Sequence, residues 1–299
     1  MDIFEGEDFV KFIERFDTDL TCKQYLSDIK WENGYKCNKC SHKRYSLRPD
    51  HSRVCTKCKH VESTTANTMF HNVKFGIRKA FLIVFEMTAT SKGISSSQAS
   101  KRYGVTRKTA WLFMHKVRIS MKSSMNMPIK GRVQVDEFTI GGKENLKVGR
   151  SKNIKKKKVV CAVELTDEDK VKRVYSLSIP DYSSKSLVTI FEKHISKIAK
   201  VTTDEWTGYK PLMKDYDITQ IPSLSGMNFK QLHHIIHQIK TWTRTIYSWV
   251  HKQHIDKYLD EYSFRINRSI YKQTIFHKLI ERIVYDKPLS YMEIISVGK

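Results

Sequence analysis

The sequence lacks any hydrophobic stretch long enough to cross a membrane. The longest uninterrupted apolar run is Ala80 to Phe85, far below the roughly 20 residues that a membrane-spanning helix needs. The first residues, from Met1 to Glu7, are acidic, whereas a secretory signal peptide begins with basic residues. We therefore expect neither membrane insertion nor secretion.

Acidic residues are also scarce. The chain has 31 Asp and Glu against 54 Lys and Arg in 299 residues, a formal net charge of +23. Such an excess of one sign indicates a polyanionic partner and is unusual for an enzyme of small molecules. Hydrophobic residues make up 40% of the chain, which excludes a disordered composition. Internal repeats and low-complexity segments are absent, so we expect a folded, multidomain protein.

Cysteine is rare, but its spacing is informative. Four of the six cysteines form two C-x2-C pairs separated by fourteen residues. Each pair presents two thiolates from one tight turn, and two such turns complete the tetrahedral shell of a structural Zn²⁺. Two coincidental pairs of buried thiols are the weaker alternative. Cys22 and Cys161 lie outside the pattern and are expected to be ordinary packed cysteines. The predicted zinc ligands are Cys37, Cys40, Cys55 and Cys58.

The first predicted domain, residues 1–70, combines an N-terminal helix with this zinc ribbon. Short segments around Tyr35, Tyr45 and Val54 are expected to be its strands, in a unit too small to fold without metal. Apolar residues between 9 and 16 have helical spacing and are expected to pack on the ribbon.

Residues 71–127 have the pattern of a helix-turn-helix DNA-binding domain. An amphipathic helix is predicted between residues 77 and 87, followed by two shorter helices. Ser96 or Ser97 is expected to cap the first of this pair and Thr106 the second.

The second helix of the pair, from residue 107 to about 118, would lie in the major groove of DNA. The plainer alternative is a helical hairpin whose charged face is only solvated. We favour DNA contact because the pair follows a zinc ribbon in a strongly basic chain. The residues expected to face DNA are Arg107, Lys108 and Thr109.

Residues 128–299 change to an α/β pattern. Three strands, a helix and a further strand are predicted, so a central sheet should be covered by helices. One more amphipathic helix is expected near residues 255–266. The predicted elements are strands at 132–140, 158–165, 173–179 and 200–204 and a helix at 183–198. A short basic run that could flank a DNA backbone consists of Lys155, Lys156, Lys157 and Lys158.

Two aspartates each follow an apolar strand segment: Asp136 after Val133 and Val135, and Asp204 after Val201-Thr202-Thr203. If the two strands are neighbours, the carboxylates converge and repel each other unless a cation neutralises them. A pair of such oxygen ligands can hold two Mg²⁺ ions that activate water at a phosphodiester. The alternative is that each is an ordinary strand-end or turn aspartate.

The order of these motifs resembles insertion-sequence transposases, specifically the bacterial zinc-ribbon group related to the eukaryotic Merlin elements. The similarity includes Trp111 in the second short helix and covers nearly the whole chain. Its other parts are the cysteine pairs, Val135-Asp136-Glu137-Phe138 with Gly141-Gly142-Lys143, Thr203-Asp204-Glu205-Trp206-Thr207-Gly208-Tyr209, and the later segments 233–242 and 258–268.

The resemblance implies a ribonuclease-H-like catalytic domain with a D-D-E or D-D-N metal site. Asp136 matches the first metal-binding aspartate and Asp204 the second. The family pattern continues with Glu or Asn five residues after a His, and with Lys two residues later in the Asn type. Here His233 is followed by Gln238 and Lys240. Gln238 offers an amide oxygen to a metal but no charge, and Lys240 could contact a phosphate.

Two weaker assignments concern the same region. Glu261 is a fallback carboxylate, ranked below Gln238 because it belongs to the family's helix signature. His233, His234 and His237 could chelate zinc, but on a helix the second of them turns away from the other two.

The predicted function is that of a transposase that binds terminal inverted repeats, cuts transposon ends and joins them to target DNA. The expected cofactors are structural Zn²⁺ and catalytic Mg²⁺ or Mn²⁺. A homodimer or higher oligomer would hold two ends together, at the chromosome in a bacterial cytoplasm. The alternative is a catalytically inactive or domesticated relative that only binds DNA, and Gln238 is the feature in its favour.

Overall fold

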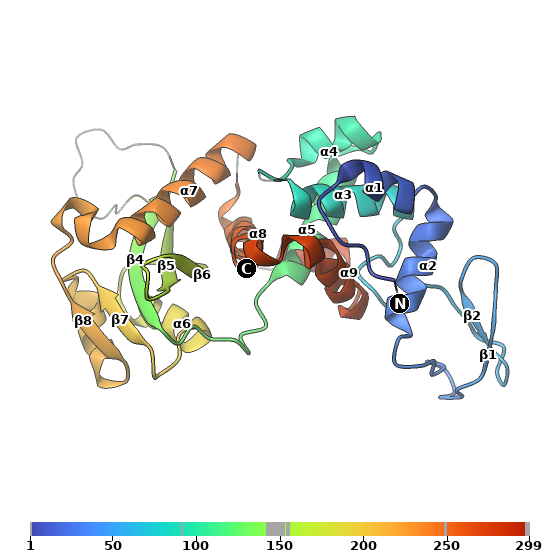
Figure 1. The fold of residues 1–299 in the computed structure, drawn as a ribbon, viewed down its shortest axis with the longest axis horizontal. Helices are drawn as coiled ribbons and strands as arrows, with labels where there is room; N and C mark the ends of the chain where they lie inside the picture. Colours follow the sequence, from blue (N-terminus) through green and yellow to red (C-terminus); the bar gives the residue numbers. More distant parts are fainter. Residues whose placement is uncertain (1, 91, 142–152, 154–155, 248–249, 297–299) are drawn as a thin grey trace. The chain divides into compact units, whose positions relative to one another are not determined.

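The helices and strands of the chain form two groups, each with its own core. A computed structural model describes the chain apart from residues 1, 91, 142–152, 154–155, 248–249 and 297–299 (Figure 1). One unit consists of the described residues of Met1–Met121 and Ile270–Val297, and the other consists of Lys122–Ser269. The last segment of the chain therefore groups with the N-terminal residues. In the described part of the chain, no helix is long and apolar enough to span a membrane.

The first unit is mainly helical, and aromatic rings fill its core. The Phe276 ring lies 5.1 Å from that of Phe12 and 5.7 Å from that of Phe81. These three rings come from helices far apart in sequence, so α9 completes a core begun by α1 and α3. The helices are α1 (Phe9–Arg15), α2 (Asp19–Lys30), α3 (Ile77–Ala89), α4 (Ser96–Tyr103), α5 (Arg107–Met121), α9 (Ile275–Tyr285) and α10 (Tyr291–Ser296).

This packing corrects the expectation that the first helix rests on the zinc ribbon. Phe12 of α1 stacks on Phe85 of α3 with ring centroids 4.1 Å apart. The ribbon has a separate small cluster around Trp31 and Tyr35. Helical spacing identified the buried face of α1 but carried no information about its partner.

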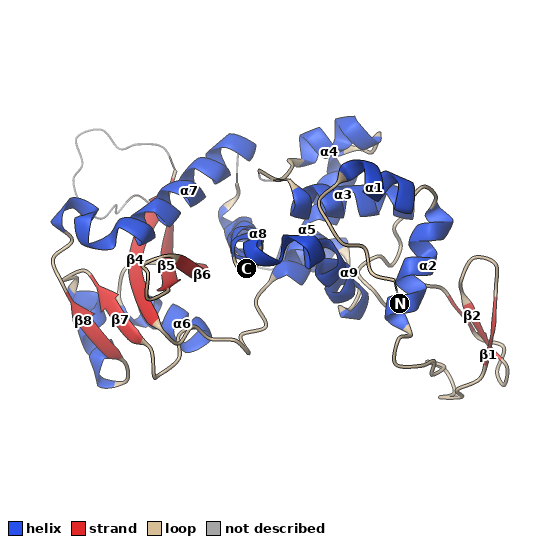
Figure 2. Cartoon of the chain, viewed as in Figure 1, coloured by secondary structure: helices blue, strands red, loops and turns tan. Residues whose placement is uncertain are grey.

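The ribbon is a three-stranded antiparallel sheet in the order β1-β2-β3. Its first two strands, β1 and β2, are labelled in Figure 2. Two of its strands were predicted, but Tyr35 lies in a loop, and the third strand instead follows the second cysteine pair. A turn closed by the Cys55 amide and the His60 carbonyl oxygen, 2.9 Å apart, reverses the chain there. The strands are β1 (Tyr45–Leu47), β2 (Arg53–Cys55) and β3 (Val61–Glu62).

The predicted helix pair is present as α4 and α5. Ser95 caps α4, because its hydroxyl accepts from the Gln98 amide and the Gln98 side chain accepts from the Ser95 amide. The prediction of Ser96 or Ser97 was therefore wrong by a residue. Gly104 ends α4 in the left-handed region, with φ of 61°. Thr106 accepts from the Thr109 amide at 3.2 Å, as expected for the cap of α5. A DNA-binding role for the pair stays a prediction.

The second unit contains a mixed five-stranded sheet in the order β6-β5-β4-β7-β8. The pairs β4–β5 and β5–β6 are antiparallel, and β4–β7 and β7–β8 are parallel. The predicted mixed sheet flanked by helices is confirmed, with one unpredicted edge strand, β8. The elements are β4 (Arg132–Ile140), β5 (Lys157–Leu165), β6 (Val171–Ile179), α6 (Ser184–His194), β7 (Lys200–Thr203), β8 (Asp217–Gln220), α7 (Lys230–Ile246) and α8 (Ile255–Ile266).

Alternation along the central strand β4 directs its side chains to two different cores. Val133 and Val135 pack in the cluster that contains Leu187 of α6. Phe138 packs in the cluster that contains Leu232 of α7. Residues 136 and 138 lie on the same face of the strand, so the side chain of residue 136 also points towards α7.

Replacing Phe276 by Ala should destabilise the first unit by about 3–5 kcal/mol, because it leaves a cavity among aromatic rings. Hydrogen exchange of the α3 amides would measure the loss. Phe9→Ala is the matched control: Phe9 is 48% exposed, so its removal should cost less than about 1 kcal/mol. Equal effects of the two changes would contradict the placement of α9 in this core.

Candidate active site and zinc cluster

The two predicted aspartates meet in the second unit. The parallel pairing of β4 with β7 ends at Val135 and Thr203, so the next residue of each strand lies at the same level of the sheet. One side-chain oxygen each of Asp136, Glu137 and Asp204 lies within 4.8 Å of the other two. The sequence-based expectation of converging carboxylates is confirmed.

Hydrogen bonds hold both aspartates in place. The Glu137 amide donates to Asp136 Oδ1 at 2.7 Å. The Trp206 amide donates to Asp204 Oδ1 at 3.1 Å, and Gln220 Nε2 donates to the Asp204 carbonyl oxygen at 2.8 Å. Both aspartates line the same cavity. A group of hard oxygen ligands at this spacing fits a divalent cation.

Glu137 is a member of this group that the sequence analysis did not assign. Its side chain is buried, and the Tyr209 hydroxyl donates to Oε2 at 2.6 Å. Burial, and then the charge of Glu137, raise the pKa of Tyr209, so the phenol keeps its proton and acts as donor. The only sequence signal was adjacency to Asp136, and strand alternation argued against a shared site.

One face of α7 borders the same space. Residues 233, 236, 237 and 240 recur at the spacing of one helical face and line a cavity of about 440 Å³. His233 Nε2 lies 3.2 Å from Asp136 Oδ2. Burial lowers the pKa of Lys240, whereas the charge of Asp136 raises it. The cavity is lined by Asp136, Glu137, Phe138, Thr139, Tyr182, Asp204, His233, Ile236, His237 and Lys240.

The structure does not bring Gln238 to the aspartates. Its amide nitrogen lies 2.7 Å from His234 Nε2, and its amide oxygen accepts from the Tyr262 hydroxyl at 2.8 Å. One residue of helix turns a side chain by about 100°, so Gln238 leaves the face that carries His237. The side chain that does contact Asp136 is His233.

Of the two weaker sequence assignments, Glu261 lies apart from the cavity lining, whereas two of the three histidines, His233 and His237, belong to it. Glu261 is fully buried on α8, where the Tyr247 hydroxyl donates to it at 3.2 Å. His234 contacts Gln238 on a different face from His233 and His237, as helix geometry predicts.

A tight turn before α7 fixes the His233 ring. Leu224, Ser225 and Gly226 have φ of 47°, 55° and 92°. A Cβ at Gly226 would collide with His233 Nδ1, so only glycine fits there. The Phe229 ring lies nearly parallel to the imidazole, with centroids 6.4 Å apart.

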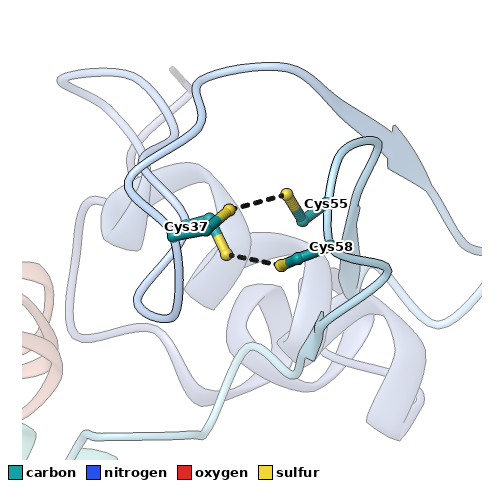
Figure 3. A group of neighbouring side chains, drawn as sticks. Cys37, Cys55 and Cys58 are labelled. Carbon is teal, nitrogen blue, oxygen red and sulfur yellow. Dashed lines mark hydrogen bonds between the residues drawn. The ribbon is translucent and has the colours of Figure 1, made fainter.

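In the first unit, the four predicted zinc ligands cluster as expected. The Sγ atoms of Cys37 and Cys58 are 3.6 Å apart (Figure 3). Those of Cys40 and Cys55 are also 3.6 Å apart. A tetrahedral Zn²⁺ with bonds near 2.3 Å needs sulfur separations of about 3.8 Å. The cluster therefore fits zinc. Cys22 and Cys161 are buried elsewhere, as predicted.

The predicted DNA-contacting residues of α5 differ in exposure. Arg107 and Lys108 are exposed, and the Lys108 ammonium lies 5.1 Å from the centre of the Tyr291 ring. Thr109 is half-buried, with its hydroxyl 2.9 Å from that of Thr106.

The predicted basic run is only partly available at the surface. Lys155 lies outside the described residues, Lys156 is half-buried and Lys157 is buried. Lys158 Nζ donates to the Pro180 carbonyl oxygen at 3.1 Å and lies 5.7 Å from the centre of the Tyr182 ring.

A comparison with known families identifies this region. Residues 128–267 match the model of the ISXO2-like transposase domain. The match runs from the segment before β4 to the end of α8 and includes Asp136, Asp204 and His233. Residues 128–267 are therefore similar to a transposase domain of the insertion-sequence group that the motifs predicted. A search of curated proteins found no match.

Cys40→Ser should abolish stoichiometric zinc binding, because three thiolates no longer close the tetrahedral shell. Metal analysis of the purified protein would show the loss, and limited proteolysis should then cut within residues 36–62. Cys22→Ala, a cysteine outside the cluster, is the control and should retain zinc. Full zinc content in Cys40→Ser would contradict the four-cysteine site.

Proposed function

We propose that the protein is a DNA transposase that binds the terminal inverted repeats of its element, cuts the transposon ends and joins them to target DNA. The observation that carries this proposal is the meeting of Asp136 and Asp204 at adjoining positions of two parallel strands. Its setting within a transposase domain supports a phosphodiester reaction rather than an unrelated cation site. A ribonuclease-H-like fold is consistent with the mixed sheet in which β4 lies at the centre.

Asp136 and Asp204 would hold Mg²⁺ or Mn²⁺. When bound, such ions activate water and stabilise the leaving oxygen of a phosphodiester. Lys240 lies on the cavity wall, where its ammonium would hold a DNA phosphate in place. Glu137, kept in place by Tyr209, adds negative charge beside the pair and strengthens the demand for a cation.

We assign the third position of the site to His233 rather than to Gln238. His233 contacts Asp136 directly, and the turn at Gly226 holds its ring there. A neutral imidazole can ligate a divalent ion. Because imidazole suits transition metals better than Mg²⁺, a site with this residue should favour Mn²⁺. His233 and Lys240 lie seven residues apart on one helical face, whereas Gln238 lies on another.

Recognition of DNA would fall to the first unit. The zinc ribbon and the α4–α5 pair supply two candidate DNA-binding elements, and the net charge of +23 favours phosphate contacts. Affinity should therefore fall steeply with salt. Holding two ends together requires at least a homodimer, at the chromosome in a bacterial cytoplasm.

The second candidate is a relative that binds DNA without cutting it. The feature that favours it is Gln238, which stands where the family pattern has Glu or Asn. If His233 occupies the third position, Gln238 no longer argues against catalysis. Its side chain then lies outside the cavity lining, where its amide oxygen accepts from the Tyr262 hydroxyl.

Cleavage and strand transfer on DNA carrying the element's own ends would test the assignment. With Mn²⁺, Asp136→Asn should lower the rate at least about 100-fold and His233→Ala at least about 10-fold, as expected when metal ligands are lost. Gln238→Ala is the matched control on the same helix and should stay within about threefold of the parent.

A different pattern would change the conclusion. Loss of activity in Gln238→Ala with an active His233→Ala would restore Gln238 as the third residue. A parent that binds ends but cuts only after Gln238→Glu would be a transposase disabled at that residue. If neither the parent nor Gln238→Glu cuts DNA but both bind the ends tightly, the protein is a relative that binds DNA without cutting it.

A further inference from the structure

A second cavity lies in the first unit. It has a volume of about 310 Å³ and opens between α5 and the loop that precedes α3. Leu112, Phe113 and Lys116 lie on one face of α5 together with Thr109, which was predicted to contact DNA. Lys74 and Phe75 come from the loop. We call this cavity the α5 pocket.

The apolar wall of the α5 pocket contains two aromatic rings. The centroids of Phe75 and Phe113 are 5.4 Å apart, and the rings meet at 77°. Both rings line the pocket, so a flat group that enters it would meet aromatic side chains. Phe113 is buried, whereas Phe75 is half-buried.

The polar part of the pocket is basic. Lys74 is exposed, and Lys116 is half-buried. Within the described part of the chain, no carboxylate lines this cavity, and the Lys116 ammonium has no hydrogen bond or ion pair. Burial alone lowers its pKa. A partly desolvated ammonium without an acidic neighbour is poised for an anion.

We infer that the α5 pocket takes a single unstacked nucleotide of DNA, with its base against Phe75 and Phe113 and its phosphate on Lys74 and Lys116. A ligand that joins a flat ring to an anion would match both the aromatic wall and the basic wall of the pocket. The cavity is far too small for a duplex, so only a base that has left its stack can enter. The inference rests on the proposed DNA binding of the protein.

Fluorescence anisotropy with the zinc-loaded full chain tests this inference. The probes are a short oligothymidylate strand, an abasic strand of the same length and charge, and a duplex. Phe75→Leu keeps an apolar side chain but removes the ring, and should weaken oligothymidylate binding about tenfold because stacking is lost. Binding of the abasic strand should not change.

Lys116→Met should weaken binding of both single strands, because its loss removes a phosphate contact. Lys11→Met, an exposed lysine of α1, is the control and should leave both affinities within about twofold. Unchanged thermal unfolding of Phe75→Leu would show that the fold is intact. If that variant unfolds early, crosslinking of 5-iododeoxyuridine strands to the parent replaces it, and the expected crosslinks are to Phe75 or Phe113.

Each outcome separates the pocket from the proposed function. Equal affinity of the parent for strands with and without bases, or crosslinks only outside the pocket, would overturn the nucleotide site while duplex binding stands. Equal weakening of all three probes by Phe75→Leu would also overturn it, since the ring would then support the fold rather than a base. Absence of duplex binding by the parent would instead contradict the proposed function.

Discussion

The electrostatic repulsion between two neighbouring carboxylates is the interaction that determines what the candidate site of the second unit can bind. The parallel register of β4 and β7 puts Asp136 and Asp204 side by side, and Glu137 adds a third carboxyl group within 4.8 Å. Folding alone gains nothing from such a cluster, because like charges at short range disfavour each other. Hydrogen bonds from backbone amides nevertheless aim both aspartates at one space. The arrangement makes physical sense when a cation is part of the working protein.

The pleat of β4 explains how one strand serves both core and site. Even-numbered side chains face α7, so Asp136 meets His233 there. Odd-numbered side chains face the α6 side, where Glu137 finds the Tyr209 hydroxyl. A shift of the register by one residue would exchange these faces and bury Asp136 among the apolar residues of the other core. The strict apolar packing on both sides of the sheet therefore also fixes the geometry of the site.

Much of this unit could be predicted from the sequence, because its strands are strongly apolar and its motifs are spaced distinctively. The strand Arg132–Ile140 and the convergence of its aspartate with Asp204 followed from pattern alone. The contact of His233 with Asp136 could not be predicted, because helical phase relative to the sheet is a tertiary property. The family's spacing of five residues pointed to Gln238. The packing partner of α1 was also missed, because amphipathic spacing identifies the buried face of a helix but not the element that covers it. The cap at Ser95 was missed because adjacent serines look equivalent in a sequence, and only the hydrogen bonds with Gln98 distinguish Ser95.

Calorimetric titration with Mn²⁺ in the absence of DNA tests the central claim most directly. Zinc-loaded parent protein should bind Mn²⁺, and Asp204→Asn should bind it at least about tenfold more weakly, because one carboxylate of the pair loses its charge. Asp217→Asn changes an exposed carboxylate on β8, outside the cavity lining, and should leave binding unchanged. Mn²⁺ affinity that is the same in all three proteins would contradict a cation site at the paired aspartates.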